Sequence, residues 1–292
     1  MPDLHTPSAA PSVALIGFGE AGSTFARAAG WEDGAAAFDV NPARGQAMDE
    51  CGVVAAADRA AALAGAEVVL SLVTADQAIA AAEQCAPFMA PGTLWCDMNS
   101  VAPDTKRAAA RAVEAAGGRY VDVAVMAPVD PARLNVPLLI AGSDAGEAMA
   151  ALNALGFAKT RVVGHAIGQA SAIKLCRSIM VKGLEALTAE MVLAASSAGV
   201  LDEVLASLDA SEKQVSWPER ADYNLDRMML HGRRRAAEMT EACAMLRDLG
   251  IAPAMTENTV QLQQGIGSLG IRPLPDTLRG KIAAIQGREY QS

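Results

Sequence analysis

The chain is poor in the residues that build metal centres and disulfide scaffolds. Its 292 residues include three histidines and five cysteines. No two of the cysteines form a C-x-x-C pair or another metal-ligand spacing, so we predict that no metal site is present. The cysteines are expected to be reduced and mostly buried thiols, which is typical of a cytoplasmic protein.

Excess basic charge and long apolar runs are also lacking. The formal net charge is −9, so no basic field is available to attract nucleic acid. No apolar run reaches the length that spans a bilayer, and the first residues lack the basic start of a secretory signal. We therefore expect a cytoplasmic protein that binds neither nucleic acid nor membrane, with a disordered tail over residues 1–11.

What the chain does have, close to its beginning, is a strand-like run followed by a glycine-rich turn. The apolar residues 13–16 precede the pattern Gly-x-Gly-x-x-Gly, and a helical pattern follows. This order is typical of a dinucleotide-binding βαβ unit, in which the helix N-terminus faces the pyrophosphate. The residues predicted to hold the cofactor here are Gly17, Phe18, Gly19, Glu20, Ala21 and Gly22.

An acidic residue stands where such a unit needs one. A second apolar run ends in Asp39, 22 residues after Gly17. A carboxylate at the tip of the second strand accepts hydrogen bonds from the adenosine ribose and repels a 2′-phosphate, which favours NAD. Arg44, five residues later, could meet such a phosphate, so NADP stays open as the alternative.

Strand and helix patterns alternate over the first half of the chain and then give way to helices. The alternation predicts an α/β, Rossmann-type, doubly wound sheet as the dinucleotide-binding domain over residues 12–165. A long helix over residues 169–197 is expected to link it to an all-helical substrate and dimerisation domain over residues 166–292. Gly232 and the stretch 265–267 are expected to interrupt the later helices.

Four motifs occur in an order that resembles the β-hydroxyacid dehydrogenase superfamily, which includes 3-hydroxyisobutyrate and 6-phosphogluconate dehydrogenases. The resemblance covers nearly the whole chain and is strongest to a phosphogluconate dehydrogenase-like branch. The four motifs are the glycine turn at 17–22, Asp97-Met98-Asn99-Ser100 with the three residues that follow, Asp122-Val123-Ala124-Val125-Met126, and Gly168-Gln169-Ala170-Ser171-Ala172-Ile173-Lys174.

The resemblance implies that Lys174 is the catalytic general acid and base. An amine in an apolar cleft beside a cationic nicotinamide would have a lowered pKa and could take the proton from a substrate hydroxyl. The alternative is a surface lysine on an amphipathic helix.

Two strand ends are further candidates, because doubly wound sheets bind ligands at the carboxyl ends of their strands. By resemblance, Val73, Thr74 and Asn99 lie near the nicotinamide and its ribose, and Ser100 lies near the substrate. The alternative for Thr74, Asn99 and Ser100 is a helix cap.

The chain departs from its better-known relatives where the substrate would bind. Met126 and Ala127 stand where those relatives carry serine and glycine, and Ser178 replaces an asparagine one turn after the lysine. We therefore expect a substrate other than 3-hydroxyisobutyrate or 6-phosphogluconate. Met126 would form an apolar wall, or would simply pack in the core.

A basic cluster over residues 231–235 is unusual in this acidic chain. His231 and Arg234 are candidates to bind a substrate carboxylate or phosphate, since arginine binds such groups with two parallel hydrogen bonds. The alternative is a solvated helix start.

Together these observations predict an NAD(P)-dependent oxidoreductase that transfers a hydride between the cofactor and a hydroxy acid or related secondary alcohol. We expect a homodimer that binds a small-molecule substrate. An imine reductase that uses NADPH is one alternative, although such enzymes usually lack a lysine at the position of Lys174. A nucleotide-binding regulatory protein without turnover is the other.

Overall fold

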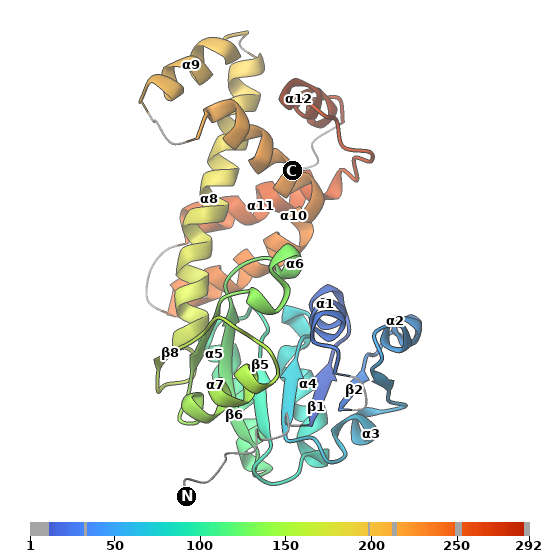
Figure 1. Ribbon diagram of the computed structural model, residues 1–292. Coiled ribbons are helices and arrows are strands. Elements are labelled where there is room, and N and C mark those ends of the chain that lie inside the picture. Colours follow the sequence, from blue (N-terminus) through green and yellow to red (C-terminus); the bar gives the residue numbers. More distant parts are fainter. Residues whose placement is uncertain (1–11, 32–33, 198, 212–214, 249–252, 289–292) are drawn as a thin grey trace, which may run out of the picture. The chain divides into compact units, whose positions relative to one another are not determined.

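The chain divides into two compact units. The computed structural model describes residues 12–31, 34–197, 199–211, 215–248 and 253–288 (Figure 1). The first unit extends to Lys174 and the second begins at Leu175, so the long helix α8 (Gln169–Ser197) starts in one unit and continues in the other. The predicted tail over residues 1–11 lies outside the described residues.

The first unit is built on an eight-stranded sheet with the strand order β3-β2-β1-β4-β5-β6-β7-β8. Neighbouring strands are parallel except β6 and β7, which are antiparallel. The strands are β1 (Val13–Ile16), β2 (Ala35–Phe38), β3 (Val54–Ala55), β4 (Val68–Ser71), β5 (Leu94–Asp97), β6 (Arg119–Val125), β7 (Leu138–Ala141) and β8 (Thr160–Gly164). The helices are α1 (Glu20–Ala29), α2 (Gly45–Glu50), α3 (Arg59–Leu63), α4 (Ala78–Cys85), α5 (Pro103–Ala115), α6 (Val129–Ala132) and α7 (Ala145–Ala154).

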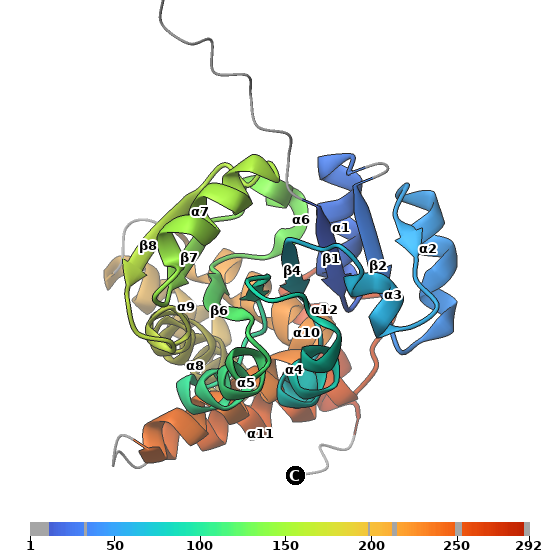
Figure 2. The same ribbon diagram turned by 90° about the horizontal axis from the view of Figure 1, so that it is seen from below.

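Helices cover both faces of this sheet, as the continuous apolar strands require. In β1, Val13 and Leu15 pack in the same core cluster as the α1 residue Phe25. Ala14 and Ile16 face the opposite way and pack with residues of α3, α4 and α5. Figure 2 shows α1 and α7 on one side of the strands and α4 and α5 on the other.

The predicted doubly wound sheet is confirmed. The strand order reverses between β1 and β4, which places the first crossover, β1-α1-β2, on one side of that point. Open α/β sheets bind their ligands at such a switch point. The connection between β6 and β7 contains the short helix α6.

The second unit is helical, with α9 (Leu201–Ser211), α10 (Trp217–Asp248), α11 (Ala254–Ser268) and α12 (Leu278–Gln286) after the remainder of α8. Its apolar core joins Val192 of α8, Leu225 of α10, Ile266 of α11 and Ile282 of α12. In the described part of the chain, no helix is long and apolar enough to cross a membrane, and no group of three or more His, Cys, Asp or Glu side chains could hold a metal ion.

The expectation that glycines interrupt the later helices is wrong for Gly232 and Gly267. Both lie inside continuous helices, α10 and α11. A Cβ on Gly232 would lie 2.2 Å from the carbonyl oxygen of Gln263, and a Cβ on Gly267 would lie 2.7 Å from Gly232 Cα. The two glycines therefore allow the backbones of α10 and α11 to touch, and this packing outweighs their low helix propensity.

Candidate functional site

The three glycines of the turn after β1 play different structural roles. Gly17 has a φ of +93°, and a Cβ there would lie 2.6 Å from the carbonyl oxygen of Leu72. A Cβ on Gly22 would lie 2.8 Å from the Gly17 carbonyl oxygen. A Cβ on Gly19 would meet no atom within 4 Å. The space beside Gly19 is thus open to a ligand that approaches the N-terminus of α1, whereas Gly17 and Gly22 are needed by the fold itself.

Asp39 is held at the carboxyl end of β2 by two backbone groups. The N–H of Phe18 donates to Oδ2 at 2.7 Å, and the N–H of Asn41 donates to Oδ1 at 2.8 Å. Each carboxylate oxygen keeps a further lone pair. The carboxylate is therefore fixed to the glycine turn while it remains able to accept from hydroxyl groups.

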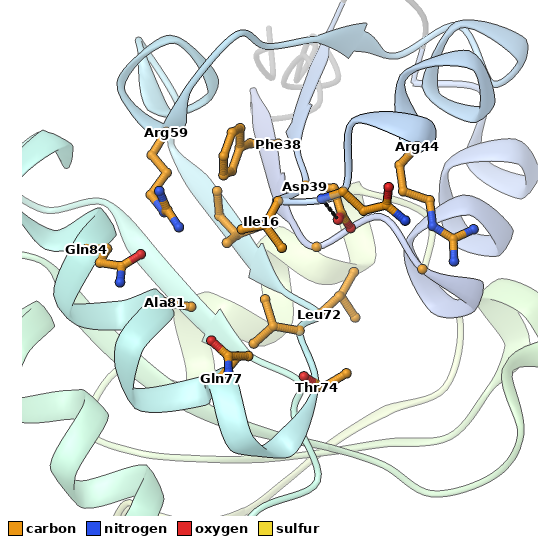
Figure 3. A pocket seen from close by; sticks show the side chains of 15 residues that line it. Ile16, Phe38, Asp39, Arg44, Arg59, Leu72, Thr74, Gln77, Ala81 and Gln84 are labelled. Carbon is orange, nitrogen blue, oxygen red and sulfur yellow. Dashed lines mark hydrogen bonds between the residues drawn. The ribbon is translucent and has the colours of Figure 1, made fainter. Parts of the chain in front are cut away.

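A cavity of about 260 Å³ opens at this switch point. Figure 3 shows Asp39 on its wall, with the side chains of Arg44 and Arg59 on either side of it. The Arg59 guanidinium lies 4.8 Å from the centre of the Phe38 ring, a cation–π contact. The lining residues predicted from the sequence are Gly17, Gly19, Asp39, Arg44, Val73 and Thr74.

Thr74 occupies the N-cap position of a short 3-10 turn, but the alternative role in which its side chain caps the helix fails. Thr74 precedes the short 3-10 turn Ala75–Gln77, but its side chain makes no capping hydrogen bond there. Val73 and Thr74 lie two and three residues after the end of β4 and border the cavity.

The alternative of a helix cap also fails for Asn99 and Ser100. Helix α5 begins at Pro103, its capping residue is Ala102, and no side chain caps it. Asn99 Nδ2 donates to Ser71 Oγ at 2.9 Å. Asn99 Oδ1 and Ser100 Oγ are buried and have no hydrogen-bond partner among the described residues. Buried polar atoms without a partner are costly, so these two oxygens point to a ligand or an ordered water at the end of β5.

Directly beneath that strand end lies a buried charge cluster. Lys106 Nζ lies 3.0 Å from Asp97 Oδ1 and 3.4 Å from Asp122 Oδ1, and all three side chains are at most 1% exposed. The Tyr120 hydroxyl donates to Asp97 Oδ2. Burial, and then the charge of Asp97, raises the pKa of Tyr120 well above its usual value. Burial raises the pKa of the Cys96 thiol to about 12.

Lys174 lies in the second turn of α8 and is half-buried. The start of that helix is anchored to the sheet, because Asp122 Oδ2 accepts hydrogen bonds from the N–H groups of Gly168 at 3.1 Å and Ser171 at 3.0 Å. A carboxylate at this position also complements the partial positive charge of a helix N-terminus.

Met126 packs against an apolar cluster. It is half-buried and contacts a cluster that includes Ala124, Leu139 and Ala170, the last of these in the first turn of α8. The neighbouring Ala127 is exposed. This contact favours the packing role for Met126.

Two of the predicted substrate residues are linked within the helical unit. Ser178 Oγ lies 3.4 Å from Lys182 Nζ, which pairs with Glu238 Oε2 at 2.5 Å. Arg234 Nη1 pairs with the other oxygen of Glu238 at 2.8 Å. Burial lowers the pKa of Lys182, although Glu238 opposes that shift. Ser178 and Arg234 therefore belong to one polar network that joins α8 to α10.

A second buried pair lies beside this network. Arg235 Nη2 lies 2.5 Å from Glu185 Oε1, and both side chains are 3% exposed. Gln263 of α11 donates to the other oxygen of Glu185 at 3.0 Å. Arg235 Nε and Nη1 have no partner among the described residues. The basic cluster is not a helix start, because His231 and Arg234 lie in the middle of α10.

Sequence reasoning missed Lys106, and one signal would have indicated it. The buried face of α5 is formed by Lys106, Ala109, Ala110 and Val113, so the lysine stands in the apolar stripe of an amphipathic helix. Asp122 likewise stands within an apolar strand. A charged residue in each of two buried patterns indicates an internal ion pair. Lys182, eight residues after Lys174, is a second buried lysine with a carboxylate partner that was not predicted.

Comparisons with known proteins agree with this geometry. Residues 12–164 match the family described as the NAD binding domain of 6-phosphogluconate dehydrogenase, and residues 195–266 match a domain of unknown function, DUF1932. A conserved hypothetical protein from Sinorhizobium meliloti is 36% identical, with 98% of this chain and 99% of that chain covered and a TM-score of 0.77.

Two further structures share the fold. Conserved protein MTH1747, reported as similar to 3-hydroxyacid dehydrogenases, is 29% identical over 92% of this chain and 98% of its own, with a TM-score of 0.71. The Mycobacterium tuberculosis 3-hydroxyisobutyrate dehydrogenase is 16% identical over 95% of this chain and 99% of its own, with a TM-score of 0.72. A third structure, an imine reductase from Aspergillus terreus, is less similar in its fold, with a TM-score of 0.59 at 19% identity over 89% of this chain and 95% of its own.

Proposed function

The chain belongs to the family of the NAD-binding domain of 6-phosphogluconate dehydrogenase, within the β-hydroxyacid dehydrogenase superfamily, and from this premise we propose that it oxidises a hydroxy acid or a related secondary alcohol. The observation that carries the proposal is the cavity at the switch point, which joins the open space at Gly19 to the fixed carboxylate of Asp39. Both features sit at the carboxyl edge of a doubly wound sheet, where dinucleotides bind.

The residues present fit a nicotinamide cofactor. The backbone beside Gly19 would receive the pyrophosphate, and Asp39 would accept from the adenosine ribose hydroxyls. Asn99 Oδ1, a buried acceptor without a described partner, would take a hydrogen bond from the nicotinamide carboxamide. When bound, the cofactor supplies the acceptor for the hydride that leaves the carbinol carbon. We propose NAD as this cofactor because Asp39 would repel a 2′-phosphate.

Lys174 is proposed to manage the proton of the same reaction. Its amine takes the hydroxyl proton of the substrate during oxidation and returns it to the carbonyl oxygen during reduction. Ser100 Oγ, buried and without a described partner, would bind the substrate next to it. In the helical unit, His231 and Arg234 are proposed to bind the anionic group of the substrate, with Ser178 tied to Arg234 through Lys182 and Glu238.

A panel of hydroxy acids and polyols, each assayed with NAD and with NADP, tests the proposed reaction. Gly19→Val is the diagnostic variant, because Gly19 has a φ of −79° that any residue adopts and a Cβ there meets nothing. The variant should fold normally yet lose cofactor binding. Gly146→Val, in equally open space on α7, is the matched control and should bind normally. Equal cofactor binding by both variants would overturn the proposed cofactor site.

Imine reduction is the second candidate, and the fold shared with an imine reductase is the observation in its favour. Lys174 favours the dehydrogenase, since the proton of an alcohol needs a base. Adding cyclic imines with NADPH to the same panel separates the two reactions.

We also propose a homodimer. Met180, Val181 and Leu184 expose apolar side chains on α8 within the helical unit, with Met180 65% exposed. Apolar groups gathered on one surface mark interaction sites. Light scattering after size exclusion should give twice the chain mass, and Met180→Lys should shift the protein towards the monomer. A monomeric wild-type protein would contradict the proposal.

A further inference from the structure

Lys106 is a completely buried charge of the sheet unit, and its ammonium contacts three oxygen atoms. It is 0% exposed. Its Nζ donates to the backbone carbonyl oxygen of Asp97 at 2.6 Å and contacts the carboxylates of Asp97 and Asp122 at 3.0 and 3.4 Å. The contact with the carbonyl oxygen is a hydrogen bond, whereas the contact with Asp122 Oδ1 is an ion pair only. Lys106 belongs to α5, while the two aspartates belong to β5 and β6.

One side of this cluster leads to Asn99. Asp97 is the last residue of β5, and its Oδ1 accepts a hydrogen bond from the backbone N–H of Asn99 at 2.9 Å. The same oxygen contacts Lys106. The position of the Asp97 carboxylate therefore determines how the chain turns out of the strand, and with it where the Asn99 side chain lies.

The other side leads to Lys174. Asp122 Oδ1 faces Lys106, and Oδ2 accepts from the backbone N–H groups of Gly168 and Ser171. These are the residue before α8 and the third residue of that helix. Lys174 follows Ser171 by three residues, which is less than one helical turn. The Asp122 carboxylate thus fixes the end of α8 that carries Lys174.

We propose that Lys106 is a positioning residue that holds Asn99 and Lys174 in one rigid frame. The inference rests on the proposed function, in which Asn99 contacts the nicotinamide and Lys174 moves the proton. Without the ammonium, the two buried carboxylates would repel each other between the neighbouring strands β5 and β6, where Asp97 and Asp122 stand side by side. Each would then move, together with the backbone N–H groups that it holds. Lys106 touches neither the cofactor nor the substrate in this account.

The test compares Lys106→Met with Lys281→Met. Lys281 is a matched control because it is 3% exposed and also pairs with two carboxylates, Asp222 and Asp226, at 2.6 and 2.9 Å in the helical unit. Both variants lose a buried ammonium and some stability. Only Lys106→Met should alter the frame around Asn99 and Lys174.

Amide hydrogen exchange is the first readout, measured by mass spectrometry on peptides that cover residues 97–101 and 166–174. In Lys106→Met both segments should exchange roughly tenfold faster, because hydrogen bonds to Asp97 and Asp122 weaken. In Lys281→Met neither segment should change. Unchanged exchange in Lys106→Met would overturn the proposal, whatever reaction the enzyme catalyses.

Kinetics are the second readout. In Lys106→Met, kcat should fall about tenfold to a hundredfold, because misplacement of a reacting group by about 1 Å costs that much. The Kd of the cofactor should rise by no more than about tenfold, because only the Asn99 hydrogen bond weakens, whereas Gly19 and Asp39 lie outside the cluster. Should Lys106→Met fail to fold, Asp122→Asn provides a second test, because its amide has a single acceptor oxygen, which can face either Lys106 or the N–H groups of Gly168 and Ser171 but not both. In either orientation the connection from Lys106 to α8 is broken. Faster exchange with unchanged kcat would refute the proposed role of Lys174 while leaving the structural link intact.

Discussion

The buried carboxylates of the two units contact different kinds of group. In the sheet unit, the carboxylates of Asp97 and Asp122 hold backbone N–H groups, and Lys106 lies between them. In the helical unit, the described bonds of Glu185 and Glu238 join side chains, such as those from Arg235 and Lys182. The first cluster shapes the chain at the site, whereas the second connects neighbouring helices. Charges that hold backbone cannot be exchanged for apolar groups, but charges that only connect side chains can be.

The largest expected effect follows from replacing the sheet cluster by apolar residues. Lys106→Met combined with Asp122→Leu leaves the N–H groups of Gly168 and Ser171 without acceptors and Asp97 without its cation. The free energy of unfolding should fall by about 3–5 kcal/mol, measured by urea denaturation. A loss below about 1 kcal/mol would show that the cluster does not hold the backbone.

Alkaline pH should act with opposite sign on the stability contributions of Cys96 in the sheet unit and Lys182 in the helical unit. The Cys96 thiol, with a pKa of about 12 against an ordinary 9.0, keeps its proton in the folded state. The unfolded chain releases that proton above pH 9, so this contribution to stability falls as pH rises from 9 towards 12, by up to about 1.4 kcal/mol per pH unit. Tyr120, whose pKa is also raised, adds to the fall at higher pH.

Lys182 should oppose this trend. Its pKa is lowered from 10.5 by burial, so the folded state releases the proton before the unfolded chain does. Its contribution therefore rises with pH up to 10.5. Urea denaturation from neutral pH to the alkaline range should show a flatter decline for Cys96→Ala and a steeper decline for Lys182→Met. Parallel curves for the wild type and both variants would contradict the assignment.

A smaller effect is expected when the helical pair is replaced as a whole. Glu185→Leu with Arg235→Met should change the free energy of unfolding by no more than about 1 kcal/mol, because two charges leave together. Glu185→Leu alone is the control and should cost several times more, since it leaves a buried guanidinium. A double variant as unstable as the single one would indicate that this pair also holds backbone groups in place.

The smallest effect concerns the thiols and leaves stability untouched. Cys176 is exposed, whereas Cys85 is buried and its pKa is raised to about 11 by burial. A thiol reagent near neutral pH should therefore modify Cys176 rapidly in the folded protein, and Cys176→Ser should remove that fast phase. Rapid modification of Cys85 would contradict the described core of the sheet unit.

The part of the site that was predictable from the sequence is the part made by local geometry. One kind of turn requires the spacing of Gly17, Gly19 and Gly22. The number of residues from this turn to Asp39 is set by the helix and the second strand that lie between them. Such features are encoded within about thirty residues. The doubly wound sheet was predictable for the same reason, because each strand and helix carries its own apolar period.

The missed parts depend on contacts between distant segments. The role of Lys106 depends on Asp122, which lies on another element, and a lysine alone does not reveal its partner. Gly232 was wrongly expected to interrupt a helix, because the close contact that requires glycine there is made with Gly267 of a different helix. Asn99 and Ser100 precede a proline-started helix, a position that suits caps, yet Ala102 takes the capping position and leaves their oxygens without a described partner.

The central claim is that Lys174 carries the proton in a hydride-transfer reaction at the site built by the sheet unit. Lys174→Met tests it most directly, with the formation of reduced nicotinamide followed on the best substrate of the panel. We predict that kcat falls by about a hundredfold or more while the Kd of the cofactor is unchanged. Turnover by Lys174→Met close to that of the wild type would contradict the account.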